Sequence, residues 1–206
     1  MKKPLILIAG PCVIENEVTP FLVAEKVQAI CQRLGIEFVF KSSYKKANRT
    51  SLNSFTGIDF DKAMQILGDI KKQFNVPVLT DIHESHEVEQ IAEVVDYLQI
   101  PAFLCRQTDL LLACGRSGKW VNIKKGQFSS PESMQFAVEK VRSTGNQKVM
   151  LTERGTTFGY QDLVVDYRGI PAKESLGVPV ILEAPHSRQR PKQTAGVSGG
   201  KPELIE

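Results

Sequence analysis

Short apolar runs recur along the chain, and each is followed by a polar turn and then by a segment with helical spacing. Most runs are continuously apolar rather than alternating, which is typical of parallel strands covered on both faces. The predicted strands span residues 5–9, 37–41, 77–80, 97–100, 120–123, 148–152 and 178–182. Alternation of strands and helices in units of about 20–35 residues predicts a parallel sheet, either open or closed into a barrel.

The segments between these runs carry the start and stop signals of helices. Thr19-Pro20 predicts an N-cap followed by a first-turn proline, and Gly35 predicts the end of that helix. Ser130-Pro131 predicts a second start of the same kind. Apolar residues at helical spacing predict another helix within residues 63–74.

The turns after the strands favour a barrel over a dinucleotide-binding sheet. Residues 9–12 read AGPC and lack the GxGxxG pattern, while polar clusters follow nearly every strand. We therefore predict an α/β fold of the TIM (β/α)8 type, as one domain spanning residues 1–206. Seven strands are predicted where a closed barrel needs eight, and residues 201–206 read like the start of a seventh helix. We expect an incomplete barrel without its last βα unit.

Composition excludes several classes of protein. A formal net charge of +3 is too small to predict a nucleic-acid surface. No apolar run approaches the roughly 18 residues of a membrane helix, and the early run at residues 5–8 fits a buried strand better than a signal peptide. The four cysteines are scattered without a CxxC pair, which predicts a reducing, cytoplasmic location.

Lysine and arginine follow most of the predicted strands, and in a barrel these positions meet at one rim. The polar and charged residues at or after the ends of successive strands include Lys41, Ser43, Lys46, Asn48, Arg49, Asp81, Gln99, Arg106, Lys124 and Arg154, with Gln99 inside its strand. Arginine offers a fork to phosphate or carboxylate and lysine a compact charge, so the set predicts a site for small polyanions. A Schiff-base aldolase using Lys124 is a competing chemistry, although so many cations suit two anionic substrates better.

Cys12 and His186 each lie directly after a predicted strand. A barrel brings them to the same mouth, where a thiolate and an imidazole suit Zn²⁺ or Fe²⁺. From the residues alone, a small buried cysteine is the favoured interpretation of Cys12, and no metal is predicted.

Seven segments carry a more specific pattern. They are IAGPC (8–12), FKSS (40–43), KANR (46–49), TDIHE (80–84), QIPAFLCRQTDL (99–110), NIKKGQF (122–128) and TERGTTFGY (152–160). In this order they resemble the 3-deoxy-D-manno-octulosonate 8-phosphate synthases, up to about residue 168. The resemblance implies a transferase, usually tetrameric, that condenses phosphoenolpyruvate with D-arabinose 5-phosphate and releases phosphate, for lipopolysaccharide biosynthesis.

The resemblance also implies roles for the rim residues. It places phosphoenolpyruvate on Lys41, Ser43, Lys124 and Arg154, and the pentose phosphate on Lys46, Asn48, Arg49 and Gln99, with Asp81 in the same substrate site. Arg106 would reach the phosphate of the sugar across a subunit interface. The residues expected to act in catalysis are Lys41, Asn48, Lys124 and His186.

Cys12 implies the metal-dependent class, because members of the metal-independent class carry Asn at this position. A divalent metal (Zn, Fe or Mn) is then expected on Cys12 and His186, with a Glu and an Asp beyond residue 206 as further ligands. The chain departs from the usual Asp-x-Thr-His-Ser pattern at Glu183 and Pro185. We expect this change to move His186 or weaken its support.

Two alternatives remain at this point. The related shikimate-pathway synthase, which uses erythrose 4-phosphate, typically reads Lys-Pro-Arg-Thr where this chain reads KANRT at residues 46–50. The asparagine favours the pentose substrate. The other alternative is a non-catalytic, truncated barrel that binds phosphorylated ligands.

Overall fold

The computed structural model describes residues 5–49, 51–160, 162–186, 189–190 and 199–200. Its main feature is a sheet of seven parallel strands in the order β1-β2-β3-β4-β5-β6-β9, in which each strand pairs with the next strand of this sheet along the chain. The strands are β1 (Ile6–Ala9), β2 (Glu37–Lys41), β3 (Val78–Asp81), β4 (Tyr97–Ile100), β5 (Trp120–Lys124), β6 (Val149–Glu153) and β9 (Val180–Leu182). All seven predicted strands are confirmed, with bounds that differ by at most two residues.

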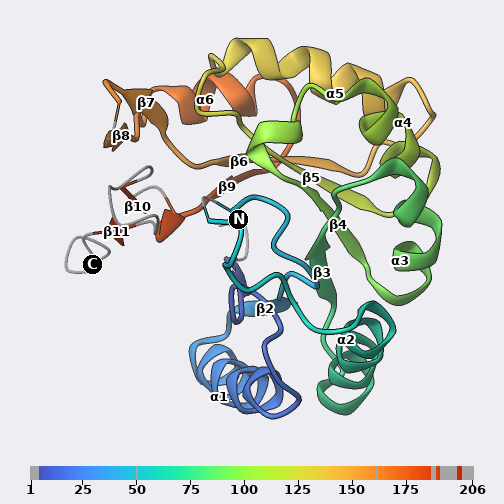
Figure 1. The fold of residues 1–206 in the computed structure, drawn as a ribbon. Helices are drawn as coiled ribbons and strands as arrows, with labels where there is room; N and C mark the ends of the chain where they lie inside the picture. The colour runs from blue at the N-terminus through green and yellow to red at the C-terminus, as the bar shows by residue number, and fades with distance from the viewer. Residues whose placement is uncertain (1–4, 50, 161, 187–188, 191–198, 201–206) are drawn as a thin grey trace.

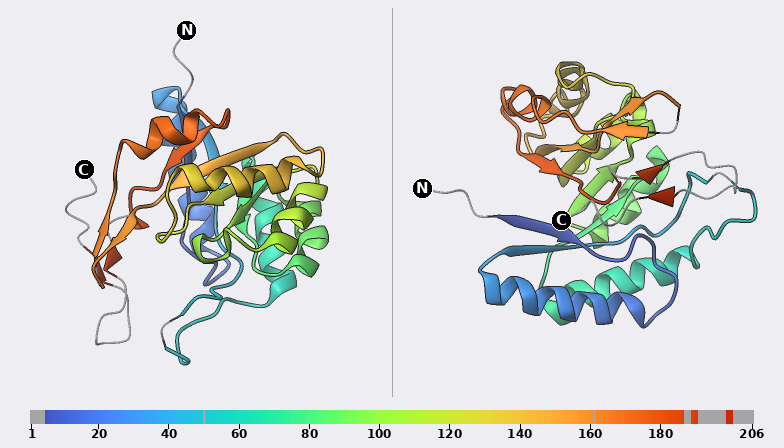
Figure 2. Two further views of the ribbon diagram at one scale, coloured as in Figure 1. Left: turned by 90° about the horizontal axis from the view of Figure 1, so that it is seen from above. Right: turned by 90° about the vertical axis from the view of Figure 1, so that its left-hand side faces the viewer.

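The sheet curls into a half-barrel with the helices on its outer face (Figure 1). Within the described residues, β1 and β9 are its two edges, and they lie on either side of the open flank (Figure 2). Every residue of β6 is buried, whereas β1 has no buried residue. The prediction of an incomplete TIM (β/α)8-type barrel is confirmed. The helix start predicted at residues 201–206 lies outside the described residues.

The outer layer consists of helices that follow the strands in turn. They are α1 (Thr19–Leu34), α2 (Phe60–Phe74), α3 (Val88–Val94), α4 (Thr108–Arg116), α5 (Gln135–Arg142) and α6 (Gly169–Glu174), with the 3-10 turns η1 (Ser85–Glu87), η2 (Ala102–Leu104) and η3 (Glu132–Met134). Their apolar faces, such as Leu67 and Ile70 of α2, pack with the strands in one core cluster. Over the part of the chain that the structure describes, none of the helices has the length and hydropathy to span a membrane.

The helix boundaries test the predicted caps. Gly35 ends α1 in the left-handed conformation at φ 64°, as expected, because glycine adopts it without a Cβ clash. The Ser130 hydroxyl accepts from the Ser133 amide, which confirms that start, although the first turn is 3-10 (η3). The prediction of Thr19 as the N-cap of α1 is wrong. Instead the Asn16 side chain accepts from the Thr19 amide at 2.8 Å.

A short hairpin after β6 was not predicted. Strands β7 (Thr156–Phe158) and β8 (Asp162–Val164) pair antiparallel, as do β10 (Gln189–Arg190) and β11 (Gly199–Gly200). The residues of β7 are all exposed, so they carry none of the apolar pattern that marks the main strands.

A close backbone approach brings the loop after β1 onto the end of β2. A Cβ at Gly10 would lie 1.9 Å from the backbone oxygen of Lys41, so only glycine fits. Beyond it, the Ser43 amide donates to the Cys12 oxygen at 3.3 Å and the Ile14 amide to the Ser43 oxygen at 3.0 Å. These contacts place Cys12 beside the polar end of β2.

Candidate active site

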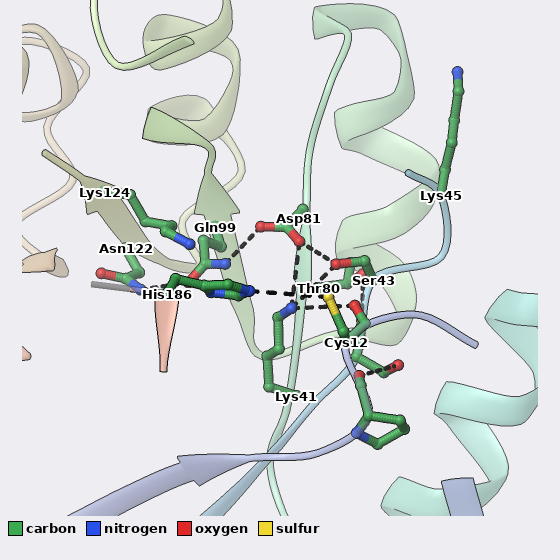
Figure 3. Close-up of polar contacts among 12 residues, drawn as sticks. Cys12, Lys41, Ser43, Lys45, Thr80, Asp81, Gln99, Asn122, Lys124 and His186 are labelled. Atoms are coloured by element: carbon green, nitrogen blue, oxygen red, sulfur yellow. Dashed lines mark hydrogen bonds and ion pairs between the residues drawn. The ribbon is translucent and has the colours of Figure 1, made fainter. Parts of the chain in front are cut away.

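The first three strands end in one polar cluster (Figure 3). Lys41 and Asp81 are the last residues of β2 and β3. The Lys41 ammonium donates to the Ser43 hydroxyl at 3.1 Å and lies 3.6 Å from Asp81 Oδ2. The Ser43 hydroxyl donates to that same carboxylate oxygen. The Lys41 ammonium also lies 3.4 Å from the backbone oxygen of Cys12, so the cluster reaches the loop after β1.

Asp81 is held ionised in this cluster. Burial raises the pKa of its carboxyl, but the charges of Lys41 and Lys124 and the hydrogen bonds from Ser43 and Gln99 outweigh burial and lower the pKa well below its usual range. Asp81 therefore acts as an acceptor and a counter-ion, and not as a proton donor.

A chain of side-chain hydrogen bonds continues from Asp81 across the inside of the sheet. Gln99 of β4 donates to Asp81 Oδ1 at 2.5 Å and accepts from the Asn122 amide of β5 at 2.8 Å. Asn122 in turn accepts from the Thr152 hydroxyl of β6 at 2.8 Å. Gln99, Asn122 and Thr152 are 5%, 1% and 2% exposed, so each bond is shielded from water.

The strands on the other side of the mouth supply a second charged cluster. The Lys124 ammonium at the end of β5 donates to Glu183 Oε1 at 2.6 Å, and the same oxygen lies 2.6 Å from His186 Nδ1. Arg154, which follows β6, donates from Nη2 to the His186 backbone oxygen at 3.3 Å. Arg154 Nε and Glu183 Oε2 lie 3.7 Å apart, and both are buried without a hydrogen-bond partner among the described residues. The expected loss of support at His186 is not seen, because Glu183 contacts its ring directly.

Cys12 and His186 meet between the two clusters, with Sγ 4.0 Å from Nε2 (Figure 3). Contact with His186 lowers the pKa of the Cys12 thiol to about 7, against the opposing effect of burial and with help from Lys41 and Lys46. The same contact, together with Glu183, raises the pKa of His186. Burial raises the pKa of Glu183, but the hydrogen bond from His186 and the charge of Lys124 lower it overall to about 2. The Cys12 thiol therefore ionises more readily than a free cysteine, beside an imidazole that Glu183 orients.

Lys124, Arg154 and His186 border a cavity of about 400 Å³ at the carboxyl ends of the strands. Its lining includes Asn48, His83, Phe103, Lys124, Gln127, Arg154 and His186. Two buried polar atoms of the lining, Gln127 Oε1 and Arg154 Nε, lack a hydrogen-bond partner within the described residues. Apolar side chains such as Pro101, Phe103 and Leu104 also line it, and Lys124 and Arg154 add positive charge. A cavity of this size with two cations on its wall suits a small anion.

Three of the predicted binding residues stand apart from the clusters. Lys46, Arg49 and Arg106 are exposed, although the charge of Lys46 helps to lower the pKa of Cys12. The cavity lining includes none of these three, nor Lys41, Ser43, Asp81 or Gln99. The Arg49 guanidinium donates to the backbone oxygens of Leu52 and Ser54, both at 3.2 Å, so it stabilises its own loop. The structure therefore brings together Cys12, Lys41, Ser43, Asp81, Gln99, Lys124, Arg154 and His186, with Asn48 on the cavity wall.

A buried charge network behind the mouth was not predicted. Lys125 and Lys173 are 1% and 0% exposed, and Glu153 between them is 2% exposed. Lys173 donates to Glu153 Oε2 at 2.7 Å, and Glu153 Oε1 accepts from the Gly155 amide at 2.7 Å and lies 3.7 Å from Lys125. Since successive side chains of a strand point to opposite faces, Lys125 and Glu153 lie behind their neighbours in the mouth. The sequence signal that could have predicted this network is the presence of charged residues at the ends of otherwise apolar strands.

The curled sheet and the cations at its carboxyl edge define an α/β-barrel protein with a site for small anions. A family model described as the DAHP synthetase I family matches residues 1–201. A 2-dehydro-3-deoxyphosphooctonate aldolase of Geotalea uraniireducens is 53% identical over 204 residues, which cover 99% of this chain and 75% of that protein. Proteins of the same name from Cyanothece sp. and Geobacter sulfurreducens are 51% and 49% identical, covering 98% and 99% of this chain and 74% and 75% of their own lengths.

This chain belongs to the DAHP synthetase I family. The resemblance to 3-deoxy-D-manno-octulosonate 8-phosphate synthases is confirmed, because the relatives are named for the same phosphorylated eight-carbon sugar acid.

Proposed function

We propose that this chain is a transferase that condenses phosphoenolpyruvate with D-arabinose 5-phosphate to give 3-deoxy-D-manno-octulosonate 8-phosphate and inorganic phosphate, a step of lipopolysaccharide biosynthesis. The names of the relatives support this reaction. The observation that carries it is the placement of three cations, where two phosphorylated substrates need them: Lys41 and Lys124 both act on Asp81, and Lys124 and Arg154 border the cavity.

Phosphoenolpyruvate is bound in this proposal by Lys41, Ser43, Lys124 and Arg154. Arg154 supports this role, because its buried Nε has no hydrogen-bond partner among the described residues and its side chain borders the cavity. The Glu183 carboxylate pairs with Lys124 and also lies close to Arg154. Lys124 and Arg154 also border the cavity, so a carboxylate or phosphate of the substrate binds them from that side.

The pentose phosphate is bound in this proposal by the loop after β2 and by β4. Asn48 borders the cavity, while Lys46 and Arg49 are exposed. Gln99 donates one of its two amide hydrogens to Asp81, and the other is a further donor of this side chain. Arg106 is exposed and reaches the sugar phosphate from a neighbouring subunit of a homotetramer.

The residues at Cys12 and His186 fit a divalent metal (Zn, Fe or Mn). A thiol with lowered pKa and an imidazole meet at 4.0 Å, and Glu183 at Nδ1 leaves Nε2 available as a ligand atom. Across the described residues, no group of three or more His, Cys, Asp or Glu side chains could hold a metal ion, so Cys12 and His186 would supply part of a site. Such a metal, when bound, polarises the aldehyde or activates water.

The chemistry asks the protein mainly to hold and orient charge. In the proposed reaction C3 of phosphoenolpyruvate attacks the sugar aldehyde, water adds at C2, and phosphate leaves with cleavage of its C–O bond. Lys41 and Lys124 neutralise the negative charge of phosphoenolpyruvate, and the planar guanidinium of Arg154 orients the substrate. Asp81 keeps Lys41 in place, since it is ionised and 3.6 Å from the ammonium.

The alternative with erythrose 4-phosphate is not favoured, although the family takes its name from that kind of synthase. The relatives are named for the eight-carbon product, and Asn48 borders the cavity. We also propose a single domain without nucleic-acid or membrane partners. A cytoplasmic location is supported by Cys12, Cys31, Cys105 and Cys114, which are all free thiols.

The proposal is tested by the initial rate of phosphate release from phosphoenolpyruvate with each sugar. We expect release with arabinose 5-phosphate and less than about one-tenth of that rate with erythrose 4-phosphate, a discrimination of at least 1.4 kcal/mol. Equal rates, or a preference for erythrose 4-phosphate, contradict the assignment of the pentose.

Metal removal provides a separate prediction. Dialysis against a chelator is expected to lower the rate of phosphate release at least about tenfold, and added Zn²⁺, Fe²⁺ or Mn²⁺ to restore it, because Cys12 and His186 offer a metal-binding pair. The Cys12→Asn variant, which lacks the thiol ligand, is the matched control for this metal dependence. If chelation leaves the rate of the unmodified protein unchanged, the metal proposal fails while the reaction stands.

A further inference from the structure

A hydrogen-bonded row of polar side chains runs across the inside of the sheet. It crosses four adjacent strands, from Thr152 of β6 through Asn122 and Gln99 to Asp81 of β3. Neither Thr152 nor Asn122 borders the cavity. Four polar side chains in a row inside a sheet require an explanation, because apolar side chains of the same size would pack there without any need for partners.

The charge of Asp81 sets the direction of the whole row. A carboxylate is only an acceptor, so Gln99 must turn its amide nitrogen toward Asp81 and its oxygen toward Asn122. Asn122 must then present its nitrogen to Gln99 and its oxygen to Thr152. Only a donor satisfies that last oxygen, and the Thr152 hydroxyl is the donor. If any amide in the row flipped, two acceptors would face each other away from water.

The far end of the row meets the groups assigned to phosphoenolpyruvate. Asp81 accepts from Gln99 on one oxygen, and from the Ser43 hydroxyl on the other, with the Lys41 ammonium 3.6 Å away. The position of the carboxylate therefore determines where Ser43 and Lys41 point. Figure 3 shows Asp81 between Gln99 on one side and Lys41 and Ser43 on the other.

We propose that Thr152 and Asn122 are positioning residues, which orient the Gln99 amide and thereby hold Asp81, Lys41 and Ser43 in the arrangement that binds phosphoenolpyruvate. This inference rests on the proposed function. It assigns the specificity of the anion site to two side chains on β5 and β6 that do not contact the ligand. Gln99 is then also a positioning residue through its bond to Asp81.

The variants Thr152→Val and Thr152→Ser form a matched pair that separates the hydroxyl from the packing. Valine keeps the shape and loses the donor, whereas serine keeps the donor and loses a methyl group. We expect T152V to raise KM for phosphoenolpyruvate about tenfold, with kcat within about threefold of the original, and T152S to stay within about threefold in both. A packing role predicts the reverse order, with T152S the weaker variant.

Titration calorimetry of phosphoenolpyruvate on the same three proteins keeps the two proposals distinguishable. If the unmodified chain binds phosphoenolpyruvate without turnover, the proposed reaction fails. The positioning role of Thr152 is still tested in that case, because it requires T152V to bind phosphoenolpyruvate more weakly and T152S to bind it as the unmodified chain does. Equal affinity in the three proteins, or a T152S affinity as low as that of T152V, overturns the positioning role. If none of them binds, both proposals fail. Far-UV circular dichroism of each variant confirms that the compared proteins are folded.

Discussion

Replacing Lys124 with methionine is expected to lower kcat for phosphate release about 10²–10³-fold, the usual cost of removing one charged donor from a reaction centre. Lys124 borders the cavity, pairs with Glu183 at 2.6 Å and contributes to the low pKa of Asp81. Its ammonium therefore faces both the substrate site and the two carboxylates that organise that site. Steady-state phosphate release at saturating concentrations of both substrates measures the effect.

Lys148→Met is the matched control, since Lys148 is exposed and directly precedes β6, at the opposite end of the strands. This variant is expected to keep kcat within about twofold. Activity of K124M within threefold of the unmodified protein, with the control unaffected, contradicts the placement of Lys124 in the reaction centre.

Replacing Glu153 with glutamine is expected to lower the free energy of unfolding by about 3–5 kcal/mol, because it leaves two buried ammonium groups without a counter-charge. Lys125 and Lys173 are both fully enclosed, and burial already lowers the pKa of Lys125. A loss of this size is a large fraction of the stability of an ordinary domain. Urea unfolding followed by circular dichroism measures the difference.

Glu139→Gln on the exposed face of α5 changes the same chemical group where water solvates it. Its free energy of unfolding is expected to change by less than about 0.5 kcal/mol. If E153Q unfolds at the same urea concentration as E139Q, the buried network contributes nothing to stability, and its account is wrong.

The sheet was predictable because its strands are covered on both faces and therefore read as continuous apolar runs. Such runs stand out against the polar turns, and all seven were found. The hairpin of β7 and β8 escaped prediction because its strands are short and largely exposed. The N-cap of α1 was misplaced because the Asn16 side chain accepts from the amides of Val18 and Thr19, upstream of the local Thr-Pro signal.

The site was predictable to the extent that strand ends meet at one rim. That rule brought Lys41, Asp81, Lys124 and Arg154 together without any knowledge of distances. It could not show that Glu183 joins three of the site residues, since this depends on where one side chain points. Nor could it reveal the row from Thr152 to Asp81 or the buried network, which exist only through contacts between strands.

The most direct test of the central claim is the mass spectrum of the product formed from phosphoenolpyruvate and D-arabinose 5-phosphate by this chain. The account predicts a phosphorylated eight-carbon sugar acid, formed in equal amount with inorganic phosphate, and its loss in the K124M variant. A folded protein that binds phosphoenolpyruvate but yields no eight-carbon product would contradict the synthase activity and leave a phosphate-binding barrel in its place.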